Sequence, residues 1–120
     1  MNFEWIAKYW PLLIEGAFQT VALLVISVGF GFVLAVGLAF ARVSGGPIAR
    51  NLALGYSTVF RGTPLLVQLL IIYTGLPLFG LRFSVVQAAL LGLALNEAAY
   101  LSETVRAGIL AVARGQREAA

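Results

Sequence analysis

Three long stretches of the chain are mainly apolar, and short clusters of arginine, glycine and proline separate them. The clearest covers residues 16–41, about 26 residues without a charge, which exceeds the roughly 20 that a helix needs to cross a bilayer. The second covers residues 52–77 and the third residues 84–110. The pattern predicts one domain of the all-α integral membrane class, with three transmembrane helices.

Residues 1–15 mix charged and aromatic side chains, among them Trp5, Tyr9 and Trp10. Trp and Tyr collect where hydrocarbon meets headgroups, so this segment predicts a short helix at the membrane interface, and membrane lipid as its partner. Pro11 is expected to break or restart that helix. A disordered lead-in is the alternative. The segment lacks the small-residue cleavage site of a secretory signal peptide.

Small residues recur every fourth position in the first apolar stretch, at Ser27, Gly31, Ala35 and Ala39. Such a line lets a second helix approach closely, because helix association in lipid depends on contact. Small residues are also simply common in membrane helices, but we favour a packing face. The segment from Arg42 to Pro47 ends the helix, with glycines for the turn and proline against continuation.

The second apolar stretch contains an interruption. Residues 64–76 make about 20 Å of helix, too little for a hydrocarbon core of about 30 Å. Residues from 52 onward must contribute, so we predict a crossing that is broken at Arg61, Gly62, Thr63 and Pro64. Thr63 would supply a capping hydroxyl and Pro64 a first-turn proline. An ordinary helix start beside an interfacial arginine is an equal alternative.

The arginines predict the orientation, because cytoplasmic loops are enriched in Lys and Arg. Residues 42–61 carry three arginines, and the end of the chain carries three more. The opposite side has only Lys8 and Arg82, with Glu4 and Glu15 opposing. We therefore expect the amino terminus outside and the carboxyl end in the cytoplasm.

Composition supports the membrane class and excludes much chemistry. The chain is 61% hydrophobic and 11% charged, whereas soluble domains carry about 25% charged residues. Cysteine, histidine and aspartate are absent, which excludes disulfides, most zinc sites and a Ser-His-Asp arrangement. No phosphate-binding loop is present. The net charge of +3 is better explained by membrane-flanking arginines than by nucleic acid, and we expect no enzyme activity, cofactor or metal.

The third stretch carries the main polar candidates. Asn96, Tyr100 and Glu103 follow the spacing of one helix face, and Arg106 stands one turn beyond Glu103. This face would line the bundle interior or a solute pathway. An ion pair that closes the cytoplasmic end is the slightly favoured alternative for Glu103. Glu97 lies deeper, where a charge is expensive, and could contact a cationic or polar solute. Protonation of Glu97, or a partner on another helix, would account for its position equally well.

Gln68, on the second crossing, could line the same interior as Asn96, and Tyr73 could do so too. In membranes, however, a glutamine is as often a hydrogen-bonding contact between helices as a ligand for a solute.

Three segments together resemble a known family: GAFQTVALLVIS, FRGTPLLVQLLIIYTGLPLFGLRFS and LALNEAAYLSETVRAGILAVARGQREAA. In this order and spacing they are similar to the membrane subunit of bacterial polar amino acid importers of the ATP-binding cassette type. The resemblance covers nearly all of the chain from about Leu12. It implies a multi-pass permease of the bacterial inner membrane.

The resemblance also implies partners. Such a subunit pairs with an identical or sister permease, binds two cytoplasmic ATPase subunits, and receives its amino acid from an extracytoplasmic binding protein. Residues 113–120 resemble the start of the coupling helix that docks on the ATPase. The residues carried over are Gly115, Gln116, Glu118, Ala119 and Ala120. Gly115 is expected to open that short helix.

The family continues beyond this motif with further crossings, so the sequence is expected to be the amino-terminal half of a permease. A truncated or non-transporting three-helix membrane protein, acting in assembly or regulation, is the alternative function.

Overall fold

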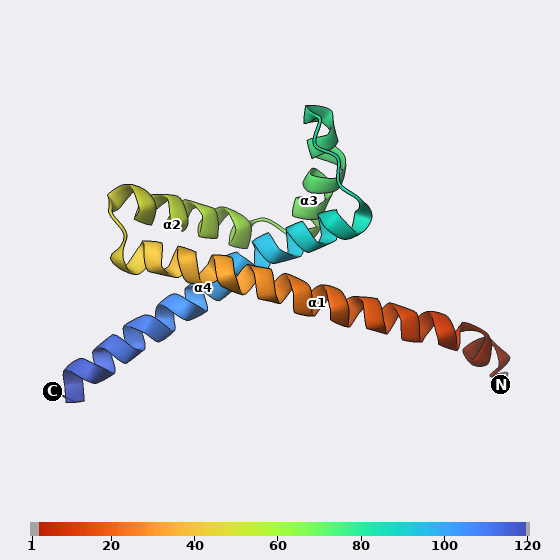
Figure 1. Cartoon of the computed structure of the whole chain (residues 1–120), viewed down its shortest axis with the longest axis horizontal. Coiled ribbons are helices and arrows are strands. Elements are labelled where there is room, and N and C mark those ends of the chain that lie inside the picture. The colour runs from red at the N-terminus through yellow and green to blue at the C-terminus, as the bar shows by residue number, and fades with distance from the viewer. Residues whose placement is uncertain (1–2, 120) are drawn as a thin grey trace.

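The computed structural model describes residues 3–119, so Ala120 of the predicted coupling segment lies outside the described residues. The described part contains helices and no strand, in the order α1 (Glu4–Ser44), α2 (Pro47–Gly62), α3 (Leu65–Leu70), a π-helical turn η1 (Ile71–Gly75), a 3-10 turn η2 (Leu76–Phe79) and α4 (Val85–Ala119). Figure 1 shows α2 lying beside the carboxyl half of α1, while α4 crosses α1. The predicted all-α class is confirmed.

The predicted break at Pro11 is wrong, because α1 continues through this residue as one helix of 41 residues. A proline inside a helix removes one backbone hydrogen bond and commonly produces a kink. Figure 1 shows the first turns of α1 bent away from the axis of the rest. The interfacial position of residues 1–15 stays a prediction.

The predicted packing face of α1 is confirmed. Its buried residues are the four small ones, Ser27, Gly31, Ala35 and Ala39. They pack on α4, whose buried residues are also small: Ala88, Gly92, Ala98, Ala99 and Ser102. At Gly31 the backbones approach so closely that an added Cβ would lie 3.0 Å from the carbonyl oxygen of Ala94. Contact between small residues therefore holds the central crossing of the fold.

The turn between α1 and α2 forms as predicted. The amide of Gly45 donates a 3.1 Å hydrogen bond to the carbonyl oxygen of Ala41. Gly46 then takes an extended conformation as the N-cap, and Pro47 occupies the first turn of α2, where its missing N–H costs nothing.

The expected interruption of the second crossing is also present. The segment from Pro47 to Gly62 and the segment from Leu65 to Phe79 meet at an angle of 104°. Among the described residues, two helices, α1 and α4, are long and apolar enough to cross a membrane, and a third span exists if the bent pair counts as one. The third crossing and the orientation stay predictions.

The last helix begins with a capping box. The Ser84 hydroxyl accepts a 3.1 Å hydrogen bond from the Gln87 amide, and the Gln87 side chain accepts one of 3.0 Å from the Ser84 amide. The helix then runs to Ala119, so the separate coupling helix expected to open at Gly115 is not present in the described residues. One glycine costs only about 1 kcal/mol relative to alanine in a helix, and good helix formers flank it.

Candidate functional site

The side chain of Gln68 bonds the backbone carbonyl groups at the break between α2 and α3. Gln68 is 6% exposed, and its Nε2 donates hydrogen bonds to the carbonyl oxygens of Phe60, at 2.8 Å, and Thr63, at 3.0 Å. Carbonyls at the end of a helix have no partner within it, and in lipid an unpaired one costs several kcal/mol. Gln68 therefore satisfies the backbone that the break exposes.

Helix α4 contributes two more side chains to the same break. Asn96 Nδ2 donates to Gln68 Oε1 at 3.3 Å, with the Phe60 carbonyl at 3.5 Å. The Tyr100 hydroxyl donates to the carbonyl oxygen of Arg61 at 3.2 Å. Asn96 and Tyr100 thus share a face of α4, as predicted, and that face binds the end of α2. These contacts give both residues a structural purpose, and their role in a solute pathway stays a prediction.

Thr63 was expected to cap the start of α3, but its hydroxyl bonds the end of α2. Its hydroxyl donates to the carbonyl oxygen of Val59 at 2.7 Å, so it serves the end of α2. Helix α3 has Pro64 as its N-cap and no side-chain capping bond. The predicted Thr63 cap of α3 is therefore wrong, because Pro64 holds the N-cap position and the Thr63 hydroxyl bonds the preceding helix.

Glu103 is the centre of a charged cluster that joins three helices. Its Oε1 accepts hydrogen bonds from Arg42 of α1 and from Ser57 of α2, the latter at 3.2 Å. Its Oε2 accepts from Arg106 at 3.2 Å, which confirms the expected pair. Arg61 completes the cluster, with Nη2 3.8 Å from Oε1 and Nε 3.0 Å from the Ser57 hydroxyl. The alternative of a pair that closes one end of the bundle fits this arrangement.

Glu97 lies apart from this cluster, on the crossing of α1 and α4. It is partly buried, and its Cβ lies 3.4 Å from the place where a Cβ on Gly31 would be. No hydrogen bond or ion pair joins its carboxylate to another described residue. Of the five tentative pathway residues, Glu97 alone has a side chain that makes no hydrogen bond or ion pair with another described residue. Its contact with a solute stays a prediction.

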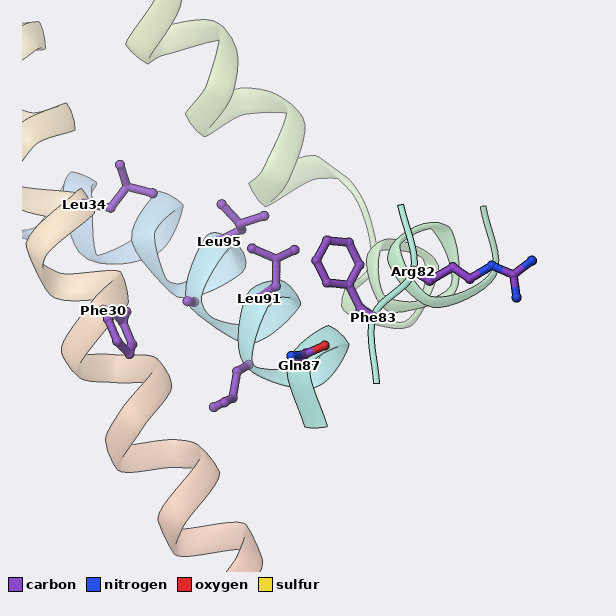
Figure 2. A pocket seen from close by; sticks show the side chains of 9 residues that line it. Phe30, Leu34, Arg82, Phe83, Gln87, Leu91 and Leu95 are labelled. Carbon is purple, nitrogen blue, oxygen red and sulfur yellow. The ribbon is translucent and has the colours of Figure 1, made fainter. Parts of the chain in front are cut away.

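One hollow in the described part of the chain is lined by none of the five tentative pathway residues. It has a volume of about 640 Å³ and lies between α1 and the first turns of α4, lined mainly by apolar side chains, including Phe30, Phe83 and Leu91. Figure 2 shows Gln87 at its edge, while Arg82 extends away from the other labelled side chains. An apolar hollow of this kind suits lipid or another helix better than a polar solute.

The predicted coupling residues lie at the free end of α4. Gly115, Gln116, Glu118 and Ala119 are exposed, and Figure 1 shows this end projecting well beyond the other helices. The position leaves these residues accessible to another protein, whereas docking itself stays a prediction.

Sequence reasoning missed three partners in the site. Arg42 and Ser57 were not linked to Glu103, and Tyr56 was not singled out, although its hydroxyl donates to the Leu95 carbonyl at 2.6 Å. Polar residues within apolar stretches were the available signal. Among the described residues, no group of three side chains could hold a metal ion.

Comparison with known proteins gives consistent matches. Residues 27–120 match the family described as "Binding-protein-dependent transport system inner membrane component". The chain is 44% identical to the putative glutamine transport system permease protein GlnP of Rickettsia conorii, over 98% of its own length and 56% of that protein. It is 43% identical to the arginine transport system permease protein ArtQ of Bacillus subtilis, over 92% of the chain and 51% of that protein.

The fold matches a solved structure as well. A crystal structure of an amino acid ABC transporter with histidines superposes with a TM-score of 0.91 and 41% identity, over 99% of this chain and 56% of that one. The chain thus spans about half the length of the relatives that it matches.

Proposed function

Because the chain belongs to the family of binding-protein-dependent transport system inner membrane components, we propose that it is the amino-terminal part of a permease subunit for ATP-driven amino acid uptake. Its relatives are permease subunits, and such subunits are not themselves enzymes, as the sequence led us to expect. The energy would come from separate ATPase subunits bound in the cytoplasm.

The continuity of α4 is the observation that carries this proposal. One helix of 35 residues joins the crossing with α1, the Glu103 cluster and the exposed carboxyl end. A helix of that length extends over about 52 Å, so a displacement of its free end would be transmitted to the residues within the bundle. We propose that the ATPase binds this end, through Gly115, Gln116, Glu118 and the residues that follow.

The partners follow from the same proposal. A second permease subunit, identical or related, would complete the solute path, and an extracytoplasmic binding protein would deliver the amino acid. The break at Arg61 to Pro64 suggests that this segment is surrounded by other helices of the permease. Such breaks persist in membranes only where protein or water supplies hydrogen bonds to the freed backbone groups. Glu97 is the candidate contact for a cationic or polar amino acid.

Substitution of Glu118 tests the docking step. In the complete permease, expressed with its ATPase, Glu118→Lys reverses a charge on the exposed end of α4 without altering any packing contact. We expect less ATPase to co-purify with the permease. Glu15→Lys is the matched control, since Glu15 is also exposed but lies near the other end of the chain. Equal ATPase recovery in both variants would count against docking through this end.

Uptake measurements test the transport function. In the complete system, Glu97→Gln is expected to reduce uptake and substrate-stimulated ATP hydrolysis while leaving ATPase co-purification intact. If both activities persist, Glu97 is not a solute contact. If the wild-type assembly binds the ATPase and moves no amino acid, the alternative of a non-transporting assembly subunit is favoured.

A further inference from the structure

The cluster around Glu103 has an imbalance of charge. Three guanidinium groups, from Arg42, Arg61 and Arg106, surround one carboxylate. Among the described residues, Glu15, Glu97 and Glu118 form no ion pair with this cluster. Two positive charges are therefore in excess where three helices meet.

The hydrogen-bond donors of the cluster are also in excess. A guanidinium has five N–H donors, and both oxygens of Glu103 are already occupied. Nε of Arg106 is buried and has no partner among the described residues. The cluster is only partly exposed, and charge that is partly withdrawn from water is stabilised by a counter-charge, so the arrangement favours an additional acceptor that carries negative charge.

The position of the cluster indicates where this acceptor comes from. Arg42 stands in the last turn of α1, at the end of an apolar segment, which is the depth of lipid headgroups. Arg61, in the last turn of α2, reaches the same carboxylate. The side chains of Arg61 and Arg106 are 38% and 33% exposed, so part of each side chain can be reached from outside the bundle. Arg42, with 15% of its side chain exposed, is held by Glu103.

The segments that carry the cluster are basic beyond it. Residues 42–61 and 103–118 hold six arginines and two glutamates: Arg42, Arg50, Arg61, Arg106, Arg114, Arg117, Glu103 and Glu118. Basic pockets between membrane helices recognise anionic headgroups, and arginine matches phosphate with paired hydrogen bonds.

We propose that Arg61 and Arg106 bind the phosphate of an anionic phospholipid, with Glu103 and Ser57 orienting the two guanidinium groups. The lipid supplies the missing negative charge and acceptor oxygens at the junction of α1, α2 and α4. This site is independent of the identity of the transported solute and of ATPase docking.

Native mass spectrometry of the purified chain in a neutral detergent tests the proposal. Dioleoylphosphatidylglycerol is titrated, with dioleoylphosphatidylcholine in a parallel series. We expect the anionic lipid to bind at least about fivefold more tightly, and Arg61→Gln and Arg106→Gln each to weaken it about fivefold. Arg61→Lys, which keeps the charge and loses the planar fork, should give an intermediate loss.

Arg50→Gln is the matched control, because Arg50 is exposed in the same basic segment as Arg61 and lies outside the cluster. A change of less than about twofold is expected there. An equal loss in Arg50→Gln and Arg61→Gln would overturn the site in favour of diffuse attraction. Circular dichroism of each variant shows whether it keeps its helix content, and Arg61→Lys keeps the test valid if Arg61→Gln does not fold.

Two further arms separate other anions from lipid. Inorganic phosphate at millimolar concentration should not displace the lipid, and full displacement would identify a site for a free anion. In the complete permease the lipid should still bind with the same dependence on Arg61. Loss of binding there would overturn the proposal, because an acidic side chain of the remaining protein would then occupy the position.

Discussion

Asn96 on α4 donates a hydrogen bond from Nδ2 to Oε1 of Gln68 on α3, across 3.3 Å and 28 positions of sequence. This bond orients the Gln68 amide so that its Nε2 faces the carbonyl oxygens of Phe60 and Thr63. A pair of uncharged amides thereby stabilises a bend of 104°. The second apolar stretch can bend sharply at this place without exposing unpaired backbone to lipid.

Removal of the Gln68 amide should destabilise the bend. Gln68→Leu keeps the size of the side chain and leaves the carbonyls of Phe60 and Thr63 unpaired. We expect the free energy of unfolding to fall by about 1–3 kcal/mol, measured by equilibrium unfolding in mixed micelles. Gln19→Leu, at an exposed position of α1, should change it little. Equal stability of the two variants would show that the bend does not depend on Gln68.

The crossing of α1 and α4 should not tolerate a side chain at Gly31. Gly31→Leu places atoms where Ala94 and Glu97 already lie, and overpacking of this kind costs about 1–3 kcal/mol. Gly29→Leu is the control, because nothing lies within 4 Å of a Cβ at Gly29. Equilibrium unfolding in mixed micelles should show this loss in the first variant only. An unchanged free energy of unfolding in Gly31→Leu would contradict the close approach.

Neutralising Glu103 should separate the three helices at their charged end. Glu103→Gln leaves the guanidinium groups of Arg42, Arg61 and Arg106 without a carboxylate. Because the cluster is only partly buried, we expect a loss of about 1–3 kcal/mol in the free energy of unfolding. Proteolysis of the turn at Gly45 and Gly46 should become faster. Glu118→Gln, at an exposed position, provides the comparison, and a matching susceptibility in both variants would exclude a clamping role.

The first turn of α4 should fray when its capping box is removed. Ser84→Ala loses the hydroxyl that accepts from the Gln87 amide, a change that typically costs about 1 kcal/mol. Hydrogen exchange at Gln87 is expected to accelerate about fivefold, since that amide is the one released. Ser44→Ala, whose hydroxyl bonds the Phe40 carbonyl, should leave exchange at Gln87 unchanged. Protection of Gln87 in Ser84→Ala would mean that packing alone holds the turn.

Local features of the sequence determined much of the fold. The long apolar stretches indicated membrane helices, and the recurrence of small residues at every fourth position, at Ser27, Gly31, Ala35 and Ala39, predicted the face that α1 buries. Gly62 and Pro64 predicted the break in the second stretch. Each of these depends on helix period, chain length or the backbone restrictions of glycine and proline, all of which act between residues that are close in sequence.

Some local predictions failed where two outcomes differ little in energy. Pro11 bends a helix or ends it, and here α1 continues. Gly115 permits a new helix to begin, and here α4 continues to Ala119. The Thr63 hydroxyl was expected to cap α3, and here it donates to the Val59 carbonyl at the end of α2.

Only the tertiary structure decided how the polar residues are used. The spacing of Asn96, Tyr100 and Glu103 placed them on one face of a helix, but nothing local said what that face would meet. The fold brings the carbonyls of Phe60 and Arg61 to Asn96 and Tyr100, and it brings Arg42 and Arg61 to Glu103. Such partners lie tens of residues apart, and their meeting depends on the angle at which α2 bends and α4 crosses. Helix packing sets those angles, which no single segment of sequence contains.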